Sequence, residues 1–214
     1  MSGLIDLLSG DFLPKFLAGM VINFEIAAIA LVIGLALGLL LAAGRLAGGV
    51  VKVITVSIIS LMRAAPTFVV MFFLLNAIPR DATLFGVPFA LSGVMTVALS
   101  LVPYSAAYVA DAGVDSIQHL RAGTTHGAFL FFPNITRAFF VLVMSSSAGA
   151  AIGVTEGITV ILRQAEQLPS FDDRLVLFAI GIVLFGIPLQ AGFMLMSLFQ
   201  RRFGRSTVEE EASA

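Results

Sequence analysis

Long stretches without a charged residue are the feature that most constrains how this chain can fold. Four of them hold at least 18 residues with no Asp, Glu, Lys or Arg: 26–44, 82–110, 138–155 and 175–200. A helix of about 20 apolar residues crosses the hydrocarbon core of a bilayer. Only 12% of the residues are charged, against about 25% in an ordinary soluble domain. The sequence therefore predicts an all-α, polytopic membrane protein.

A fifth candidate span, residues 53–79, is interrupted only by Arg63. Five spans place the two termini on opposite sides of the membrane. Connections on one side then carry eight Lys and Arg residues and those on the other side four. The positive-inside rule predicts an N-terminus outside and a C-terminus in the cytoplasm. We expect one transmembrane domain over residues 1–206 and a short, disordered acidic tail over 207–214.

Small residues recur at the spacing with which helices pack closely in lipid. Gly34 and Gly38 form one such pair and Gly44 and Gly48 another, and a longer series runs from Ser145 to Gly157. This spacing predicts close contacts between helices.

The residue inventory excludes most catalytic chemistry. The chain has no cysteine, no G-x-x-x-x-G-K-(S/T) phosphate loop, and only two histidines, which lie in one polar connection. We therefore expect no enzymatic activity, no cofactor and no metal. The basic residues form no patch for nucleic acid. What remains is transport.

Ionisable residues in or beside the spans are the first candidates for a solute path. Glu25 precedes the first charge-free run and binds solute or makes an interfacial or interhelical hydrogen bond. Arg63, three residues before Pro66, is interpreted as a structural cation that extends to the cytoplasmic surface. Asp111 lies one turn before Asp115, and the two cap the helix, pair with Arg121 or form a solvated face.

The connection between the third and fourth spans is the longest cytoplasmic projection of the predicted fold. Residues 111–120 are predicted to be helical, and Gly123 and Gly127 are expected to break the helix. A membrane protein driven by a soluble partner needs such a projection, although a plain connecting loop explains it equally well. The candidate coupling residues are Asp115, His119, Arg121, Gly123, His126 and Gly127.

Four segments carry a likeness to a known family. Residues 19–26 (GMVINFEI) are similar to the pattern G-x-x-x-T-L-x-(I/L), with Asn23 where threonine is usual. Residues 61–68 (LMRAAPTF) are similar to F-R-G-T-P, and residues 100–111 (SLVPYSAAYVAD) to a pattern of S-L followed by A-A-Y-x-x-E. Residues 152–156 (IGVTE) are similar to I-G-V-P-E. The positions taken as the structural motif are Arg63, Pro66, Tyr108, Asp111, Gly153 and Glu156.

In this order and on these spans, the segments resemble the permease subunits of bacterial polar amino acid ABC importers. The resemblance covers nearly the whole chain and implies the type I permease fold of ABC importers, in the bacterial inner membrane and in contact with lipid. It also implies a second permease subunit, cytoplasmic ATP-binding subunits that hydrolyse ATP, and an external solute-binding protein.

Two departures from the family pattern matter. The family's cytoplasmic loop carries E-A-A, a glycine and later I-L-P; here Pro133 matches that proline, and residues before it are missing. In the family this loop docks the ATPase, so we predict a divergent half of a heteromeric permease whose partner keeps the full loop. In the fourth span, the family's K-D-T-S patch near the translocation path is matched by Met144, Ser145, Ser146 and Ser147.

The sequence thus predicts the permease subunit of an ATP-driven importer of amino acids or closely related small polar solutes. A charged solute needs polar partners at bilayer depth. The candidates are Ser145, Ser146, Ser147, Glu25 and Asn76. Alternatively, the serines bond to carbonyls of the preceding turn. Two rival functions remain: a secondary transporter or channel that uses Glu25 or Asp111 without ATP, and a structural subunit that carries no solute.

Overall fold

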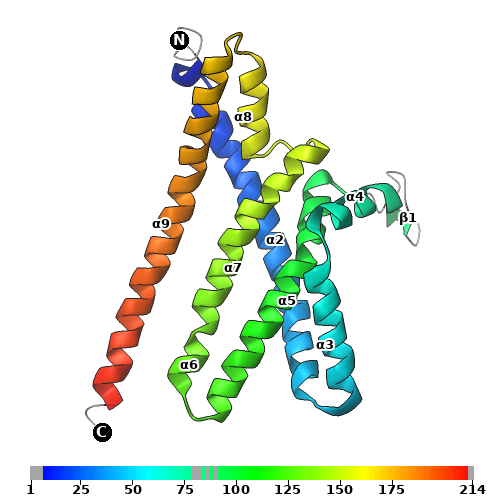
Figure 1. Cartoon of the computed structure of the whole chain (residues 1–214), viewed down its shortest axis with the longest axis vertical. Coiled ribbons are helices and arrows are strands. Elements are labelled where there is room, and N and C mark those ends of the chain that lie inside the picture. The colour runs from blue at the N-terminus through cyan, green and yellow to red at the C-terminus, as the bar shows by residue number, and fades with distance from the viewer. Residues whose placement is uncertain (1–6, 79–82, 85–86, 89–90, 212–214) are drawn as a thin grey trace. The chain divides into compact units, whose positions relative to one another are not determined.

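The computed structural model describes residues 7–78, 83–84, 87–88 and 91–211, with side chains except at 83–84, 87–88, 125–126 and 199–211. The described chain is almost entirely helical (Figure 1). An antiparallel pair of two-residue strands, β1 (Thr83–Leu84) and β2 (Val87–Pro88), precedes α5. The helices are α2 (Phe12–Leu46), α3 (Gly49–Ala64), α4 (Thr67–Ala77), α5 (Gly93–Arg121), α6 (Thr125–Phe129), α7 (Phe131–Ser145), the 3-10 helix η1 (Ser146–Ile152), α8 (Gly157–Glu166) and α9 (Phe171–Glu211).

Four helical stretches of the described chain are long and apolar enough to cross a membrane: Phe12–Leu46, Gly93–Arg121, Gly127–Ile152 and Phe171–Leu198. Each overlaps one of the four charge-free runs. Helices α3 and α4 make up the fifth candidate when they are counted together as one broken span. The predicted all-helical fold is confirmed, with the fifth span broken at Ala65 and Pro66, where the proline disfavours helical backbone in the preceding residue.

The predicted third span begins later than the apolar run does. Residues 82–110 are free of charge, but the helix begins at Gly93, after the strand pair. Ser92 marks this boundary, because its Oγ accepts a hydrogen bond of 3.1 Å from the backbone N–H of Met95, as an N-cap residue does. Apolar composition alone does not distinguish a helix from a short hairpin.

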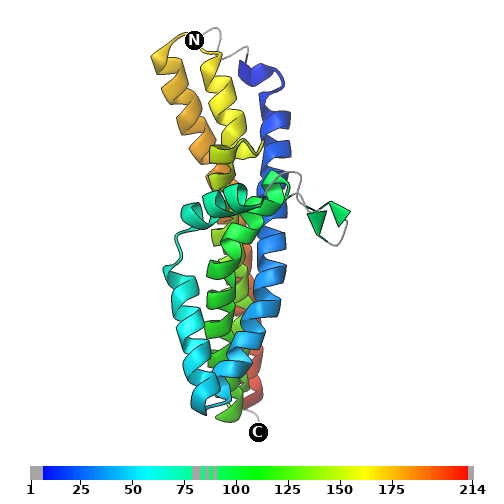
Figure 2. The ribbon, with the colours of Figure 1, turned by 90° about the vertical axis from the view of Figure 1, so that its right-hand side faces the viewer.

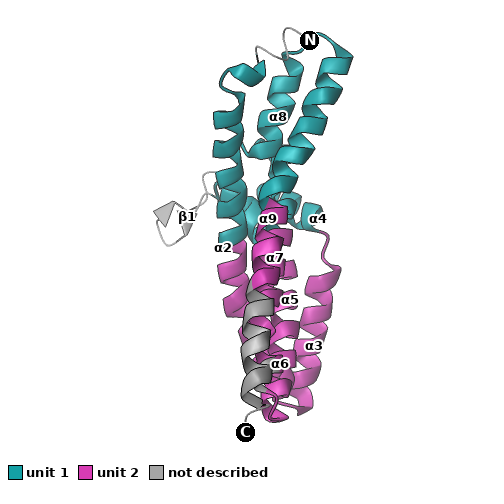
Figure 3. Cartoon of the chain, turned by 90° about the vertical axis from the view of Figure 1, so that its left-hand side faces the viewer, with its two compact units in different colours: residues 1–29, 67–101, 142–188 teal, residues 30–66, 102–141, 189–214 magenta. Residues whose placement is uncertain are grey.

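Contacts divide the chain into two compact units (Figure 3). Unit 1 comprises Met1–Ile29, Thr67–Leu101 and Leu142–Pro188, and unit 2 comprises Ala30–Pro66, Val102–Val141 and Leu189–Ala214. The helices α2, α5, α7 and α9 each contribute residues to both. The single domain over 1–206 stays a prediction. So does the disordered tail over 207–214, although α9 continues to Glu211.

Unit 2 is held together by close contacts of glycines in α2 with its neighbours. A Cβ on Gly34 would lie 2.0 Å from the Ser105 Oγ, and one on Gly38 would lie 2.7 Å from the Ala106 carbonyl oxygen. A Cβ on Gly44 would lie 2.6 Å from the hydroxyl of Thr55 on α3. The C-terminal half of α2, α3 and the C-terminal half of α5 therefore run side by side (Figure 2). The close helix contacts predicted from the glycine spacing are confirmed here.

Unit 1 packs the first half of α2 against α8 and α9. The rings of Phe16 and Phe185 meet edge to face with centroids 5.8 Å apart. Gly181 of α9 leaves no room for a Cβ beside Ile161 of α8. Gly19 lies against the backbone just before α8, where a Cβ would come within 2.8 Å of the Glu156 carbonyl carbon. These contacts bring α2 to the N-terminus of α8.

Candidate functional site

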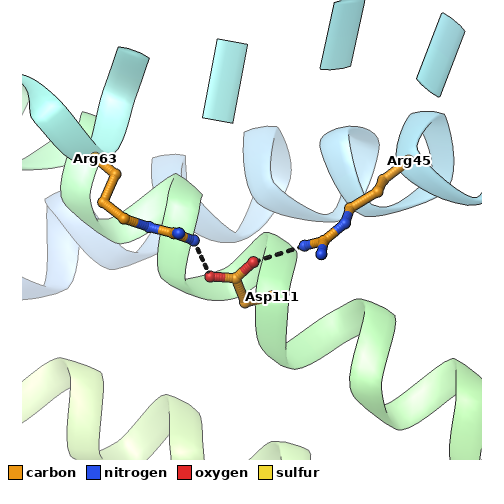
Figure 4. A network of polar contacts seen from close by, with 3 residues as sticks. All are labelled: Arg45, Arg63 and Asp111. Carbon is orange, nitrogen blue, oxygen red and sulfur yellow. Dashed lines mark hydrogen bonds and ion pairs between the residues drawn. The ribbon is translucent and has the colours of Figure 1, made fainter. Parts of the chain in front are cut away.

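A charged cluster in unit 2 joins three helices through one carboxylate (Figure 4). Arg45 donates from Nη1 to the Asp111 Oδ1 at 2.8 Å, and Arg63 donates from Nη2 to the other oxygen, Oδ2. The side chains of Arg45, Asp111 and Arg63 are 37%, 39% and 59% exposed. Two positive charges against one negative charge leave a formal charge of +1, in a cluster that is open on one side.

Local structure explains how these three residues come together. Arg45 lies in the last turn of α2 and Arg63 in the last turn of α3, where positive charge is favourable for a helix. Asp111 lies within α5, at the end of a charge-free run. Of the three alternatives left open for Asp111, pairing with Arg121 does not occur: the carboxylate is paired with Arg45 and Arg63. Ten residues of helix separate Asp111 from Arg121 by about 15 Å, so Asp111 bonds to the neighbouring helices instead.

The structure gives Arg63 a partner that the sequence does not predict. The sequence predicts a structural cation that extends to the cytoplasmic surface. In the structure its guanidinium is bound to α5 through Asp111.

A second polar cluster lies in unit 1 and is buried. The Glu156 carboxylate is 0% exposed. It caps α8 by accepting from the backbone N–H groups of Ile158 and Thr159 at 2.9 and 2.8 Å, and from the Thr159 hydroxyl at 3.0 Å. The Asn23 amide of α2 donates to the same carboxylate at 3.0 Å. None of the ion pairs among the described residues includes Glu156.

Asn23 links this cap to η1. Its Nδ2 also donates to the Ser146 Oγ at 2.8 Å, and its Oδ1 accepts from the backbone N–H of Gly157 at 3.0 Å. The Ser146 hydroxyl in turn donates to the Val143 carbonyl at 2.7 Å. Every polar atom of the Asn23 side chain is therefore bonded within the protein, which is the condition for burying such a group at low cost.

The candidate path residues are not brought together. Ser146 is fully buried and bonded as described, while Ser145 and Ser147 are half-buried. Glu25 is exposed on α2. Asn76 is exposed on α4 and donates to the Phe72 carbonyl of its own helix at 2.7 Å. Their role in solute passage stays a prediction.

The candidate coupling residues lie at the end of α5 and in α6. Asp115, His119 and Arg121 are exposed in α5. Gly123 adopts φ +78° between the helices, so it ends α5 as expected. Gly127 does not break a helix, because it lies within α6, where a Cβ would come within 2.4 Å of the His119 ring. The side chain of His126 lies outside the described residues.

The remaining motif residues have structural positions. Pro66 lies in the break between α3 and α4. Tyr108 is half-buried on α5, and its ring centroid lies 6.2 Å from that of Tyr104. Gly153 ends η1 with φ +81°, a left-handed conformation that favours glycine.

Sequence reasoning assigned no site role to Arg45 or Asn23. Arg45 was counted only among the basic residues that set the orientation. An acidic residue at the end of a span, such as Asp111, nevertheless indicates a cation on a neighbouring helix. Asn23 was noted as a departure from the threonine of the family pattern. The polar side chain of Asn23, in an otherwise apolar helix, could have indicated that it has a buried hydrogen-bond partner.

The chain is similar in structure to a chain in the crystal structure of an amino acid ABC transporter with histidines. The TM-score is 0.68 and the sequence identity 21%, and the alignment covers 92% of this chain and 97% of that chain. No family model and no curated protein matches the sequence. The chain therefore shares the fold of that transporter chain, and four of its described helical stretches, or five with the bent pair α3 and α4, are long and apolar enough to cross a membrane.

Proposed function

We propose that this chain is the permease subunit of an ATP-driven importer for amino acids or closely related small polar solutes. The observation that carries the proposal is the fold likeness, which extends over 92% of this chain and 97% of an amino acid ABC transporter chain. The four sequence segments that resemble polar amino acid permeases support it independently.

The proposal assigns ATP hydrolysis to separate cytoplasmic subunits, because the sequence contains no phosphate-binding loop. Closure of two such subunits on ATP would move the permease core between outward-open and inward-open states. An external solute-binding protein would deliver the solute and provide most of the selectivity. The complex would lie in the bacterial inner membrane, with the N-terminus outside and the C-terminus in the cytoplasm.

The proposal favours a heterodimeric permease. The part of the chain that corresponds to the family's docking loop contains the last turns of α5 and then α6, a separate helix of five residues. A helix this short offers about one turn for insertion into an ATPase groove. We infer that the partner permease carries the full docking loop, and that substitutions over residues 115–127 of this chain leave ATP-driven uptake unchanged. Severe uncoupling by any one of them would contradict this inference.

Co-purification tests the proposed assembly. The tagged chain is expressed with its genomic neighbours and isolated in mild detergent, and every recovered subunit is quantified. We expect a second permease and an ATPase in fixed ratio. Proteoliposomes of that complex, supplied with the binding protein and ATP, are then expected to take up amino acids.

Other results would favour the rival functions. A chain that purifies alone, and transports solute without ATP, would be a secondary transporter or channel. A complex whose uptake kinetics do not change when the serines at 145, 146 and 147 are replaced would favour a structural subunit that carries no solute.

A further inference from the structure

The charged cluster of Arg45, Asp111 and Arg63 has a net positive charge and unused hydrogen-bond donors, so it can bind an anion. Its formal charge is +1, and only Nη2 of the Arg63 guanidinium is hydrogen-bonded within the described part of the chain. A guanidinium carries five N–H donors in a planar fork that matches a carboxylate or phosphate group. With 59% of its side chain exposed, Arg63 presents the remaining donors to whatever enters from outside.

Asp111 fixes this fork in place. Without a partner, an arginine side chain explores many rotamers, and binding must order them. The bond from Arg63 to Asp111 and the bond from Arg45 to the same carboxylate hold the three groups on α2, α3 and α5 together (Figure 4). The guanidinium is therefore partly pre-organised, and the single carboxylate does not neutralise both cations.

The same face of α5 offers surfaces suited to a small organic molecule. Tyr104 and Tyr108 lie seven and three residues before Asp111, a spacing that places all three on one side of the helix. Their rings are 6.2 Å apart and Tyr104 is 37% exposed. This face therefore presents aromatic surface one to two turns from the anion-binding fork.

We propose that this cluster is an oxyanion site in which Arg63 binds the carboxylate of the transported amino acid, with Asp111 as a positioning residue. The inference rests on the proposed function. The cluster replaces the serines of the fourth span as the first contact to test, because Ser146 is fully buried and already bonded. The net positive charge selects solutes with a free carboxylate over the corresponding amides.

A lipid phosphate has the same chemistry, but the position of Arg63 argues against it. Lys52 lies in the first turn of α3, and the eleven residues from Lys52 to Arg63 span about 16 Å of helix. The side chains near Lys52 include Val50, Val53 and Ile54, which are 75%, 65% and 54% exposed and suited to hydrocarbon. If Lys52 lies at the headgroups, the backbone of Arg63 lies well below them, but its guanidinium shares Asp111 with Arg45 from the last turn of α2, so the lipid arm of the experiment decides between the two anions.

Ligand binding to the purified complex tests the proposal without the external binding protein. The complex is placed in phosphatidylcholine nanodiscs, and saturation-transfer NMR is recorded with a mixture of the L-amino acids and then with their carboxamides. We expect transfer to the acids and at least about tenfold weaker binding of the carboxamides, the range given by loss of a charged hydrogen bond. The R63Q variant is expected to bind the acids about tenfold to a hundredfold more weakly.

The K52Q variant is the matched control, since it removes one exposed positive charge from the same helix. It is expected to bind the acids within about twofold of wild type. Equal binding of acids and carboxamides by the wild-type complex would overturn the proposal, and this comparison does not depend on the folding of R63Q. Wild-type-like binding by R63Q would also overturn it.

Two further experiments show whether a negative result concerns the proposed site or the proposed function. If phosphatidylglycerol in the nanodiscs abolishes binding of the acids by wild type, Arg63 serves a lipid phosphate and the proposal fails. If proteoliposomes take up amino acids under ATP equally well with R63Q and wild type, the site assignment fails and the proposed importer stands. If the wild-type complex takes up no amino acid, the proposed function fails together with the site assignment.

Discussion

Glu156 in unit 1 and Asp111 in unit 2 are both acidic residues that adjoin a charge-free run, but their surroundings differ in exposure and in charge. Glu156 is 0% exposed and accepts only from neutral donors. Asp111 is 39% exposed and lies between two guanidinium groups. The first arrangement uses its donors completely and caps a helix. The second retains unused donors and a net charge, which a structural cap does not need.

Replacement of Glu156 by alanine is expected to have the largest effect on stability. It leaves one N–H of the Asn23 amide and the backbone N–H groups of Ile158 and Thr159 without their acceptor, each at about 1–3 kcal/mol, so the free energy of unfolding should fall by at least about 3 kcal/mol. Unfolding of the purified chain by SDS in mixed micelles measures this loss. E166A, at an exposed position on the same helix, is the control and should remain within about 0.5 kcal/mol of wild type. Equal effects of the two variants would show that the cap is not needed for stability.

A methyl group at Gly19 should distort the same cap without removing any polar group. Its Cβ would lie 2.8 Å from the backbone of Glu156 and Gly157, which cannot move without disturbing the hydrogen bonds of Asn23. We expect G19A to lower the free energy of unfolding by about 1–3 kcal/mol, as overpacking does. G186A on α9 has open space around its Cβ and should be neutral or up to about 1 kcal/mol stabilising. Stabilisation by both variants in thermal unfolding would contradict the close contact.

Two neighbouring serines of the fourth span should differ in their effect on stability, because one is fully buried and the other is half-buried. S146A removes the acceptor of one Asn23 hydrogen bond and should cost about 1–2 kcal/mol in SDS unfolding. S147A, at a half-buried neighbouring position, should change stability by less than about 0.5 kcal/mol. A larger loss of stability from S147A than from S146A would contradict the assignment of the stabilising hydrogen bond to Ser146.

Asp111 should matter least for stability. Its ion pairs are more than one third exposed, so D111N is expected to cost no more than about 1 kcal/mol. The loss should shrink in high salt, because screening weakens the pairs that are removed. Unfolding measured at low and high salt checks both statements. A loss as large as that of E156A would remove the contrast between the two clusters and make the Asp111 cluster structural.

The helical spans were readable from the sequence because bilayer depth excludes charge, and the runs 26–44, 138–155 and 175–200 lie in or overlap the spanning helices. The strand pair inside 82–110 was not, since its residues are as apolar as the helix that follows. Ser92 was the local signal for the start of α5, because serine is a preferred N-cap residue.

The polar clusters were harder to predict than the spans. Asn23 and Glu156 are separated by 133 residues, and Arg45 and Asp111 by 66. Helix periodicity shows which residues share a face of one helix, but it does not show which helix that face contacts. The sequence therefore pointed to Glu156, Arg63 and Asp111, but it did not show that Arg63 pairs with Asp111, or that Asn23 and Arg45 complete the two clusters.

The 3-10 helix η1 also affects how far the fourth span reaches. Seven residues of 3-10 helix rise about 14 Å, whereas the same residues in an α-helix would rise about 10 Å. The segment thus advances by roughly the height of two more α-helical residues without lengthening the sequence. The segment ends at the left-handed turn of Gly153, three residues before the buried Glu156 that caps α8.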